Sequence, residues 1–212
     1  MKTFIRVALA VVCVIASCNA GEQCSCQPEE ILETISEVLD YRDAWPLLTS
    51  SDTLYLMRLP LHPPIGAIQC VISTLYQEKP TFPNVRRWIL YLDAIKGEKW
   101  QQKLVTLTMT PKPGSNSSSS FTTNDFPSFG TLFSVLFVDS KCLIFRIFSY
   151  TVGGRTGCAW WVKESARDNR LWHCRLIFDF FCGVSYQEIY KKEACDHMTK
   201  KTKISNRLLG KL

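Results

Sequence analysis

The chain has 212 residues, 46% of them hydrophobic, which is enough for one domain with a buried core and excludes a largely disordered protein. Its formal net charge is +6, and much of this charge lies in the tail 198–212. A basic tail either attracts an anionic partner or is simply solvated. This one has no aromatic residues among its charges, so we predict a disordered tail and neither a nucleic-acid nor a membrane partner.

Residues 1–20 have the pattern of a secretion signal. A positively charged start precedes an apolar core that is too short to span a bilayer, and small residues lead up to Ala20. Cleavage after Ala20 would release an extracellular protein with a single domain over 21–197, followed by the basic tail.

The next segment, 28–45, is predicted to be an amphipathic helix with glutamates in its first turn, ended by Trp45-Pro46. Short runs of β-branched and aromatic residues follow, separated by Pro, Gly, Asn and Asp, as is typical of strands. They are 53–59, 68–76, 87–95, 100–109, 131–138, 142–152 and 158–163. An eighth strand is expected between Phe121 and Phe129.

A second helix is predicted over 166–181, because Leu171, Cys174 and Phe178 fall on one stripe and Gly183 can end the helix. Trp160, in the last strand, is expected to face outward and pack under this helix. No helix alternates with the strands, and the connections are short. The pattern therefore predicts a mostly β fold, either an antiparallel sandwich or a barrel.

Eight of the ten cysteines follow the signal, and in a secreted chain they indicate a disulfide frame. Eight cysteines can pair in about a hundred ways, so their number does not establish the connectivity. Asn116 begins the N-glycosylation sequon, in a serine-rich loop, and predicts a glycoprotein.

Several motifs occur in a characteristic order. They are Asp43-Ala44-Trp45, Leu54-Tyr55-Leu56-Met57-Arg58, Cys70 in the second strand, Cys142-Leu143-Ile144, and then Cys158, Trp161, Cys174 and Cys195. This set resembles the tick salivary lipocalins, the histamine-binding family, over residues 28–196. The resemblance implies an eight-stranded antiparallel lipocalin β-barrel, stapled by disulfides, with an N-terminal helix and a C-terminal helix packed outside.

The resemblance also implies which cysteines pair. The implied bridges are Cys70–Cys195, Cys142–Cys174 and Cys158–Cys182. Cys24 and Cys26 are left over, and they would pair between chains or react with small thiols. Otherwise a monomer is expected.

The family resemblance identifies two pocket positions. Amine-binding members carry one acid just after the first cysteine of the array and another two residues before the tryptophan, because a buried ammonium needs carboxylates. Here these positions hold Leu143 and Ala159, so both acids are missing. Strand alternation then places Phe145 and Ile147 on one strand, and Trp161 and Lys163 on the other, on the same inward face. The expected pocket wall is therefore apolar.

An acidic head group on the ligand would need a cation. The candidates are Arg58, Arg86, Arg87, Lys163 and His62, and Arg58 is included in the predicted ligand site. The same inward side chains are also those that fill a small barrel solidly, so a filled interior remains the alternative to an open pocket.

Other kinds of site are not predicted. The histidines His62, His173 and His197 are scattered without metal-ligand spacing, so we predict no metal site. No nucleophile arrangement or phosphate-binding loop is present, so we predict no enzyme, no catalytic residues and no cofactor.

The resemblance implies a secreted salivary protein that evades host defence by sequestering a small mediator of inflammation or haemostasis. The missing acids favour a lipid, such as a leukotriene or a fatty acid. Family membership alone would favour a biogenic amine, histamine or serotonin. The alternative from another class is an inhibitor that binds a complement or clotting protein through the barrel exterior.

Overall fold

The computed structural model describes residues 40–61, 68–76, 79–93, 99–111, 118–152, 155–193 and 195–196. The chain divides into two compact units, and the described residues belong almost entirely to the second, which begins at Tyr41. The predicted signal peptide, His62, His197, the sequon at Asn116, the basic tail, and Cys24 and Cys26 lie outside the described residues.

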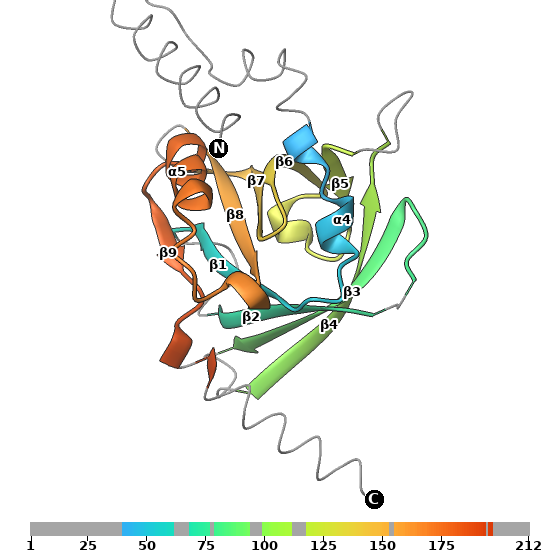
Figure 1. Cartoon of the computed structure of the whole chain (residues 1–212), viewed down its shortest axis with the longest axis horizontal. Coiled ribbons are helices and arrows are strands. Elements are labelled where there is room, and N and C mark those ends of the chain that lie inside the picture. The colour runs from blue at the N-terminus through green and yellow to red at the C-terminus, as the bar shows by residue number, and fades with distance from the viewer. Residues whose placement is uncertain are drawn as a thin grey trace, which may run out of the picture. The chain divides into compact units, whose positions relative to one another are not determined.

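The second unit is built mainly of β-strands (Figure 1). In chain order the elements are η1 Asp40–Arg42, α4 Trp45–Leu48, β1 Leu54–Pro60, β2 Ile68–Leu75, β3 Asn84–Asp93, β4 Lys99–Met109, β5 Ser120–Thr122, η2 Pro127–Phe129, β6 Leu132–Val138, β7 Cys142–Val152, β8 Arg155–Lys163, η3 Glu164–Ala166, α5 Trp172–Cys182 and β9 Tyr186–Glu188. Among the described residues, no helix combines the length and the apolar character that a membrane crossing requires.

Strands β1 to β8 form a closed antiparallel barrel. Each pairs with the next in sequence, and β1 pairs with both β8 and β2. Where β1 and β2 separate, the segment around β9 bridges them: the Ile189 N–H donates to the Met57 carbonyl at 2.9 Å, and the Cys70 N–H donates to the Ile189 carbonyl at 3.2 Å. The predicted eight-stranded barrel is confirmed, whereas β9 was not predicted because three residues carry too little pattern.

The two ends of the barrel differ. Because neighbouring strands run in opposite directions, the connections β1–β2, β3–β4, β5–β6 and β7–β8 share one end. The other end is crossed by α4, whose Leu47 and Leu48 are buried in the barrel core. We call this second end the α4 end.

The predicted end of the N-terminal helix is wrong. Trp45-Pro46 opens α4, with the proline in its first turn. This is favourable because the first helical N–H groups have no partner within the helix, so proline loses nothing there. The rest of the predicted helix, residues 28–39, lies outside the described residues.

The C-terminal helix α5 packs on the outside of β7 and β8 (Figure 1). It begins at Trp172 instead of residue 166, because η3 ends at Ala166 and a turn with irregular backbone over residues 167–171 separates η3 from α5. Its buried Phe178 lies 5.9 Å, ring centre to ring centre, from Trp160, which therefore faces outward under the helix as predicted. Gly183 ends the helix with a φ of 76°, a conformation that glycine adopts without a steric penalty.

Three disulfides connect the barrel to the C-terminal segments. They are Cys70–Cys195, Cys142–Cys174 and Cys158–Cys182, the pairs that the family resemblance implies. Two of them tie α5 to β7 and β8, and the first ties the segment after β9 to β2.

Candidate ligand site

The barrel interior holds a cavity of about 370 Å³. This volume lies within the range of about 300–1,000 Å³ that is typical of small-molecule sites. All five residues of the predicted wall line it: Leu143, Phe145, Ile147, Ala159 and Trp161. Of the two alternatives, the structure therefore has the open interior.

Strand alternation explains why these residues face the cavity. On β7 and β8, Leu143 is opposite Trp161 and Phe145 is opposite Ala159. The residues between them, such as Trp160, face α5 instead. One face of this sheet lines the cavity and the other packs against α5, so side chains on both faces are buried. This explains why these strands are apolar at both odd and even positions.

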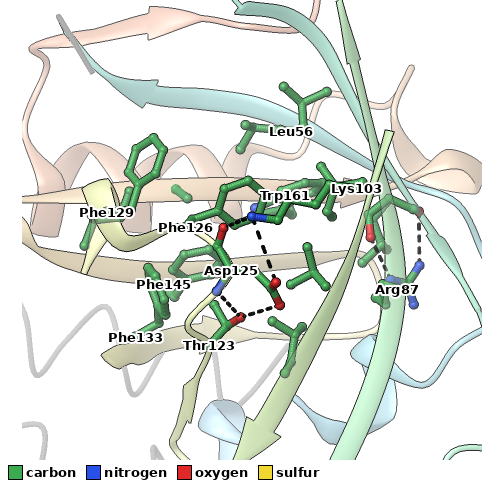
Figure 2. Close-up of a pocket in the computed structure, with 18 of the residues that line it drawn as sticks. Leu56, Arg87, Lys103, Thr123, Asp125, Phe126, Phe129, Phe133, Phe145 and Trp161 are labelled. Atoms are coloured by element: carbon green, nitrogen blue, oxygen red, sulfur yellow. Dashed lines mark hydrogen bonds and ion pairs between the residues drawn. The ribbon is translucent and has the colours of Figure 1, made fainter. Parts of the chain in front are cut away.

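Three phenylalanines that line the cavity form an aromatic cluster, and Figure 2 labels two of them, Phe133 and Phe145. Phe121, Phe133 and Phe145 lie on neighbouring strands, with ring centres 5.1–5.5 Å apart. The strand register brings the three rings together. Phe121 is opposite Phe133, and Phe133 is opposite Ile147, which lies two residues from Phe145 and so faces the same side of the strand. Sequence reasoning identified only Phe145, because it applied strand parity only to β7 and β8.

The cavity also contains one lysine–aspartate pair (Figure 2). Lys103 Nζ donates a hydrogen bond to the Asp125 carbonyl and lies 4.0 Å from its Oδ1. It also lies 5.0 Å from the centre of the Phe126 ring. Asp125 is the one carboxylate among the described lining residues, so the lining is not free of acids as the two pocket positions predicted.

The place of Asp125 follows from the short strand β5. β5 pairs with β4 only at Thr108 and Met109, so the rest of β4 has no strand on that side among the described residues. The β5–β6 connection folds against this free edge, and the Asp125 Oδ2 accepts the Thr106 N–H at 2.9 Å. Strand periodicity gives no information about a loop residue, which is why this position was missed.

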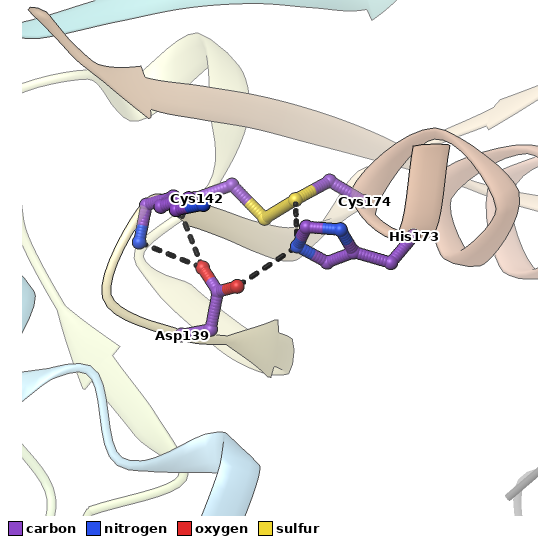
Figure 3. The surroundings of a disulfide bond; sticks show 5 residues. Asp139, Cys142, His173 and Cys174 are labelled. Carbon is purple, nitrogen blue, oxygen red and sulfur yellow. Dashed lines mark hydrogen bonds and ion pairs between the residues drawn. A yellow bond between two sulfur atoms is a disulfide. The ribbon is translucent and has the colours of Figure 1, made fainter. Parts of the chain in front are cut away.

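A second polar cluster lies outside the barrel (Figure 3). Potential ligand atoms of Asp139, Cys142, His173 and Cys174 lie within 4.8 Å of one another. The two cysteines are bonded to each other, so neither offers a thiolate to a metal ion. His173 Nε2 contacts Asp139 Oδ2 at 2.9 Å, and Asp139 Oδ1 accepts the Cys142 N–H at 2.7 Å. The cluster holds α5 against the β6–β7 turn.

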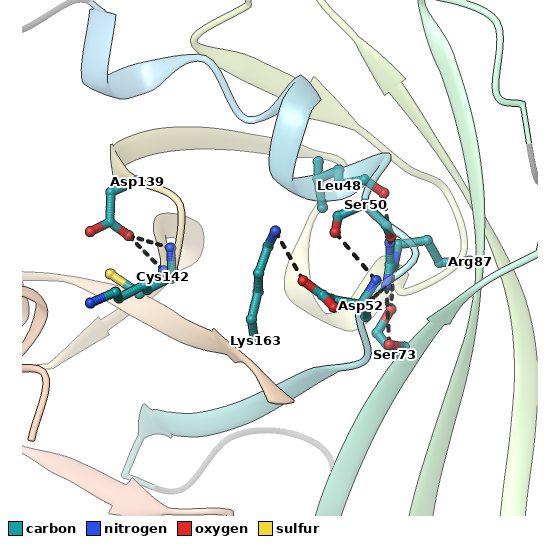
Figure 4. A network of polar contacts seen from close by, with 9 residues as sticks. Leu48, Ser50, Asp52, Ser73, Arg87, Asp139, Cys142 and Lys163 are labelled. Atoms are coloured by element: carbon teal, nitrogen blue, oxygen red, sulfur yellow. Dashed lines mark hydrogen bonds and ion pairs between the residues drawn. The ribbon is translucent and has the colours of Figure 1, made fainter. Parts of the chain in front are cut away.

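Arg87 lines the cavity near the α4 end, but its donors are occupied (Figure 4). Its guanidinium makes five hydrogen bonds of 2.6–3.1 Å: Nε to Ser73 Oγ, Nη1 to the carbonyls of Leu48 and Ser50, and Nη2 to those of Asp52 and Ser73. An arginine has five N–H donors. Arg87 therefore has no donor left for a ligand, and it fastens the segment after α4 to the barrel.

The environment of Arg87 also affects its charge. The side chain is only 1% exposed, and this burial lowers the pKa of Arg87 to about 10, partly opposed by the charge of Asp52. The group remains protonated at neutral pH, where the carbonyl dipoles around it stabilise its charge.

The assignment of Arg58 to the ligand site is wrong. A β-bulge between Leu56 and Arg58 shifts the register of β1 against β8, so Leu59 faces the cavity and Arg58 faces outward. Under α5, the guanidinium of Arg58 lies 3.8 Å from the Tyr186 ring centre and bonds Asp179 Oδ1 at 3.2 Å.

We therefore expect Arg58→Met to lower the free energy of unfolding by about 2 kcal/mol, through loss of the buried cation–π contact and of its charged hydrogen bond. Ligand affinity, measured by calorimetry on the folded variant, should remain within about twofold of wild type. A clear loss of affinity without a loss of stability would place Arg58 at the ligand after all.

Of the other candidate cations, Arg87 lines the cavity, Arg86 and Lys163 do not, and His62 lies outside the described residues. Arg86 lies over the Tyr76 ring at 4.7 Å and is not among the lining residues. Lys163, which strand alternation predicts on the inward face, is also not among the lining residues; its Nζ pairs with Asp52 Oδ2 at 3.2 Å (Figure 4). The described cations that line the cavity are Arg87 and Lys103.

Solved structures with the same architecture identify the fold. Japanin from Rhipicephalus appendiculatus, bound to cholesterol, shares 17% identity and a TM-score of 0.53, with 70% of this chain and 97% of Japanin covered. Apocrustacyanin C2 shares 13% identity and a TM-score of 0.51, and the match covers 86% of this chain and 95% of apocrustacyanin C2. Insecticyanin from the tobacco hornworm Manduca sexta shares 10% identity and a TM-score of 0.51, and the match covers 73% of this chain and 86% of insecticyanin. The fold is therefore a lipocalin barrel.

The family is narrower than the fold. The family model of the tick histamine binding protein matches residues 33–197, well over half of the chain. The chain belongs to this family. No curated protein sequence matches it.

Proposed function

We propose that this protein is secreted into the host and captures a small mediator of inflammation or haemostasis, lowering its free concentration without chemical change. The observation that carries this proposal is the apolar cavity with Trp161 on its wall. A preformed cavity is favourable for capture because little of the binding free energy is lost in rearranging the protein.

Within this function, the lining favours a lipid, such as a leukotriene or a fatty acid. Most of the lining side chains are apolar, and the phenylalanine cluster adds a broad aromatic surface. Burying about 200 Å² of apolar ligand surface supplies about 5 kcal/mol before the costs of association. The cholesterol in Japanin is consistent with an apolar ligand in a barrel of this fold.

A biogenic amine is the second choice. The positions that would carry acids hold Leu143 and Ala159, and both line the cavity. Asp125 does offer a carboxylate, but the ammonium of Lys103 already lies 4.0 Å from it. A ligand ammonium there would meet a site whose net charge is close to zero, which gives little electrostatic attraction.

The experiment that tests the function is calorimetric titration of the secreted, glycosylated protein with leukotrienes, arachidonate, histamine and serotonin in parallel. Tight binding of a lipid without binding of an amine is the expected result. Tight binding of an amine alone would reverse the choice of ligand, and no binding of any of them would contradict capture of small mediators.

Restoring the missing acids should restore amine binding. The double variant Leu143→Asp, Ala159→Glu places two carboxylates on the cavity wall, where a bound ammonium would be paired. We expect histamine affinity to rise by about tenfold or more, measured by calorimetry, with near-ultraviolet circular dichroism confirming the native fold. The single variant Ala159→Glu is the control and should give a smaller gain. A folded double variant without any gain would contradict the assigned role of these positions.

Binding of a host protein is a second candidate function, and one observation favours it. Trp172 and Leu176 lie one turn apart on α5 and are 63% and 61% exposed. Exposed large apolar side chains side by side are typical of interaction surfaces. The same titrations separate the two functions, because α5 lies outside the barrel and small-molecule capture does not need it.

A further inference from the structure

We propose that Lys103 and Asp125 form a subsite for a hydroxyl group, so that the ligand is an apolar molecule carrying an alcohol, such as a hydroxylated lipid. This inference rests on the proposed function, since it names the polar group that the captured lipid would carry. It predicts a preference against both a free carboxylate and a free ammonium at this point of the cavity.

The first argument is the number of free hydrogen-bonding positions. An ammonium has three N–H donors, and Lys103 uses one of them on the Asp125 carbonyl, its one hydrogen bond to the described residues. In Asp125, Oδ2 accepts from the Thr106 N–H and the Thr123 hydroxyl. Oδ1 accepts no hydrogen bond from the residues that the structure describes. The pair therefore presents a free donor and a free acceptor together.

The second argument is distance. Lys103 Nζ and Asp125 Oδ1 are 4.0 Å apart, which is too far for a direct hydrogen bond. One oxygen atom can lie about 2.8 Å from both, which is an ordinary hydrogen-bond length. A hydroxyl can accept from the lysine and donate to the aspartate at the same time. A carboxylate can only accept, and an ammonium can only donate.

The third argument is charge and surroundings. A ligand carboxylate at Lys103 would lie beside the Asp125 carboxylate, and a ligand ammonium at Asp125 would lie beside Lys103, so either ion meets one repulsive neighbour. The neutral hydroxyl meets none. Phe126 lies against Lys103, and Trp161 and the phenylalanine cluster line the same cavity, so the rest of the ligand would contact apolar surface.

A set of four probes with one chain and different head groups tests the subsite. Dodecanol, dodecyl methyl ether, dodecanoate and dodecylamine are each titrated calorimetrically into the full protein. We expect the alcohol to bind about tenfold more tightly than the ether, which has lost one hydrogen bond donated to a charged acceptor. The alcohol should also bind more tightly than the acid and the amine.

Two charge-removing variants should change this order in opposite directions. Asp125→Asn leaves the positive charge of Lys103 without a neighbouring negative charge. The affinity for dodecanoate relative to dodecanol should therefore rise by about tenfold. Lys103→Met leaves the negative charge of Asp125 without a neighbouring positive charge, so the affinity for dodecylamine relative to dodecanol should rise by a similar factor. The matched controls are Lys163→Met and Asp52→Asn, which break the same kind of ion pair outside the lining and should leave the order unchanged.

The outcomes separate the two proposals. If all probes bind with equal affinity, or both variants weaken every probe alike, the hydroxyl subsite is wrong while apolar capture stands. If no probe binds and the mediators do not bind either, capture itself is wrong and the subsite with it.

Discussion

Replacing Arg87 with methionine should lower the free energy of unfolding by about 3–5 kcal/mol, the cost typical of breaking a buried, fully bonded ionic group. The variant would leave carbonyl groups of Leu48, Ser50, Asp52 and Ser73 without the hydrogen bonds of the guanidinium. The measurement is urea unfolding at neutral pH with the disulfides intact. The midpoint and slope of the transition give the free energy of unfolding.

Arg86→Met is the matched control, since Arg86 precedes Arg87 on β3 but contacts the Tyr76 ring and is not among the cavity-lining residues. It should lose no more than about 1 kcal/mol. Arg87→Lys should fall between the two, because three rotatable donors cannot reproduce a planar five-donor network. If Arg87→Met unfolded like the control, the network would be dispensable and α4 would be held by its leucines alone.

Replacing Trp161 with alanine should weaken binding of the captured lipid by about thirtyfold, or about 2 kcal/mol. The indole faces the cavity between Leu56 on β1 and Leu143 on β7, so the variant removes a large apolar surface from the middle of the wall. Calorimetric titration with the tightest lipid from the mediator panel measures the loss. The titration is run well below the unfolding temperature of the variant.

Trp172→Ala is the control for this variant, because Trp172 is an exposed tryptophan on α5 that does not line the cavity. Lipid affinity should be unchanged in this variant. Equal affinities in all three proteins would remove Trp161 from the ligand site. A loss in Trp172→Ala alone would instead move the binding surface to α5.

The sequence determined the parts of the molecule that depend on local pattern. Alternating side chains on β7 and β8 are enough to predict that Leu143, Phe145 and Trp161 face one side and Trp160 the other, because the period of a strand is two. The same reasoning applies to the barrel, since short strands without intervening helices have few ways to bury their apolar faces. The disulfide pairs came from the ordered motifs of the family and not from pattern alone.

Only the tertiary structure shows which side chains line the cavity where the two-residue period of a strand is broken or where a loop supplies the side chain. A bulge after Leu56 turns Arg58 outward, and strand alternation cannot foresee a register shift. Asp125 enters the lining because the short strand β5 leaves an edge of β4 that the following loop covers. Whether Arg87 is a ligand group or a structural one depends on five acceptors from residues 14 to 39 positions away in sequence. Such long-range contacts exist only once the barrel has closed.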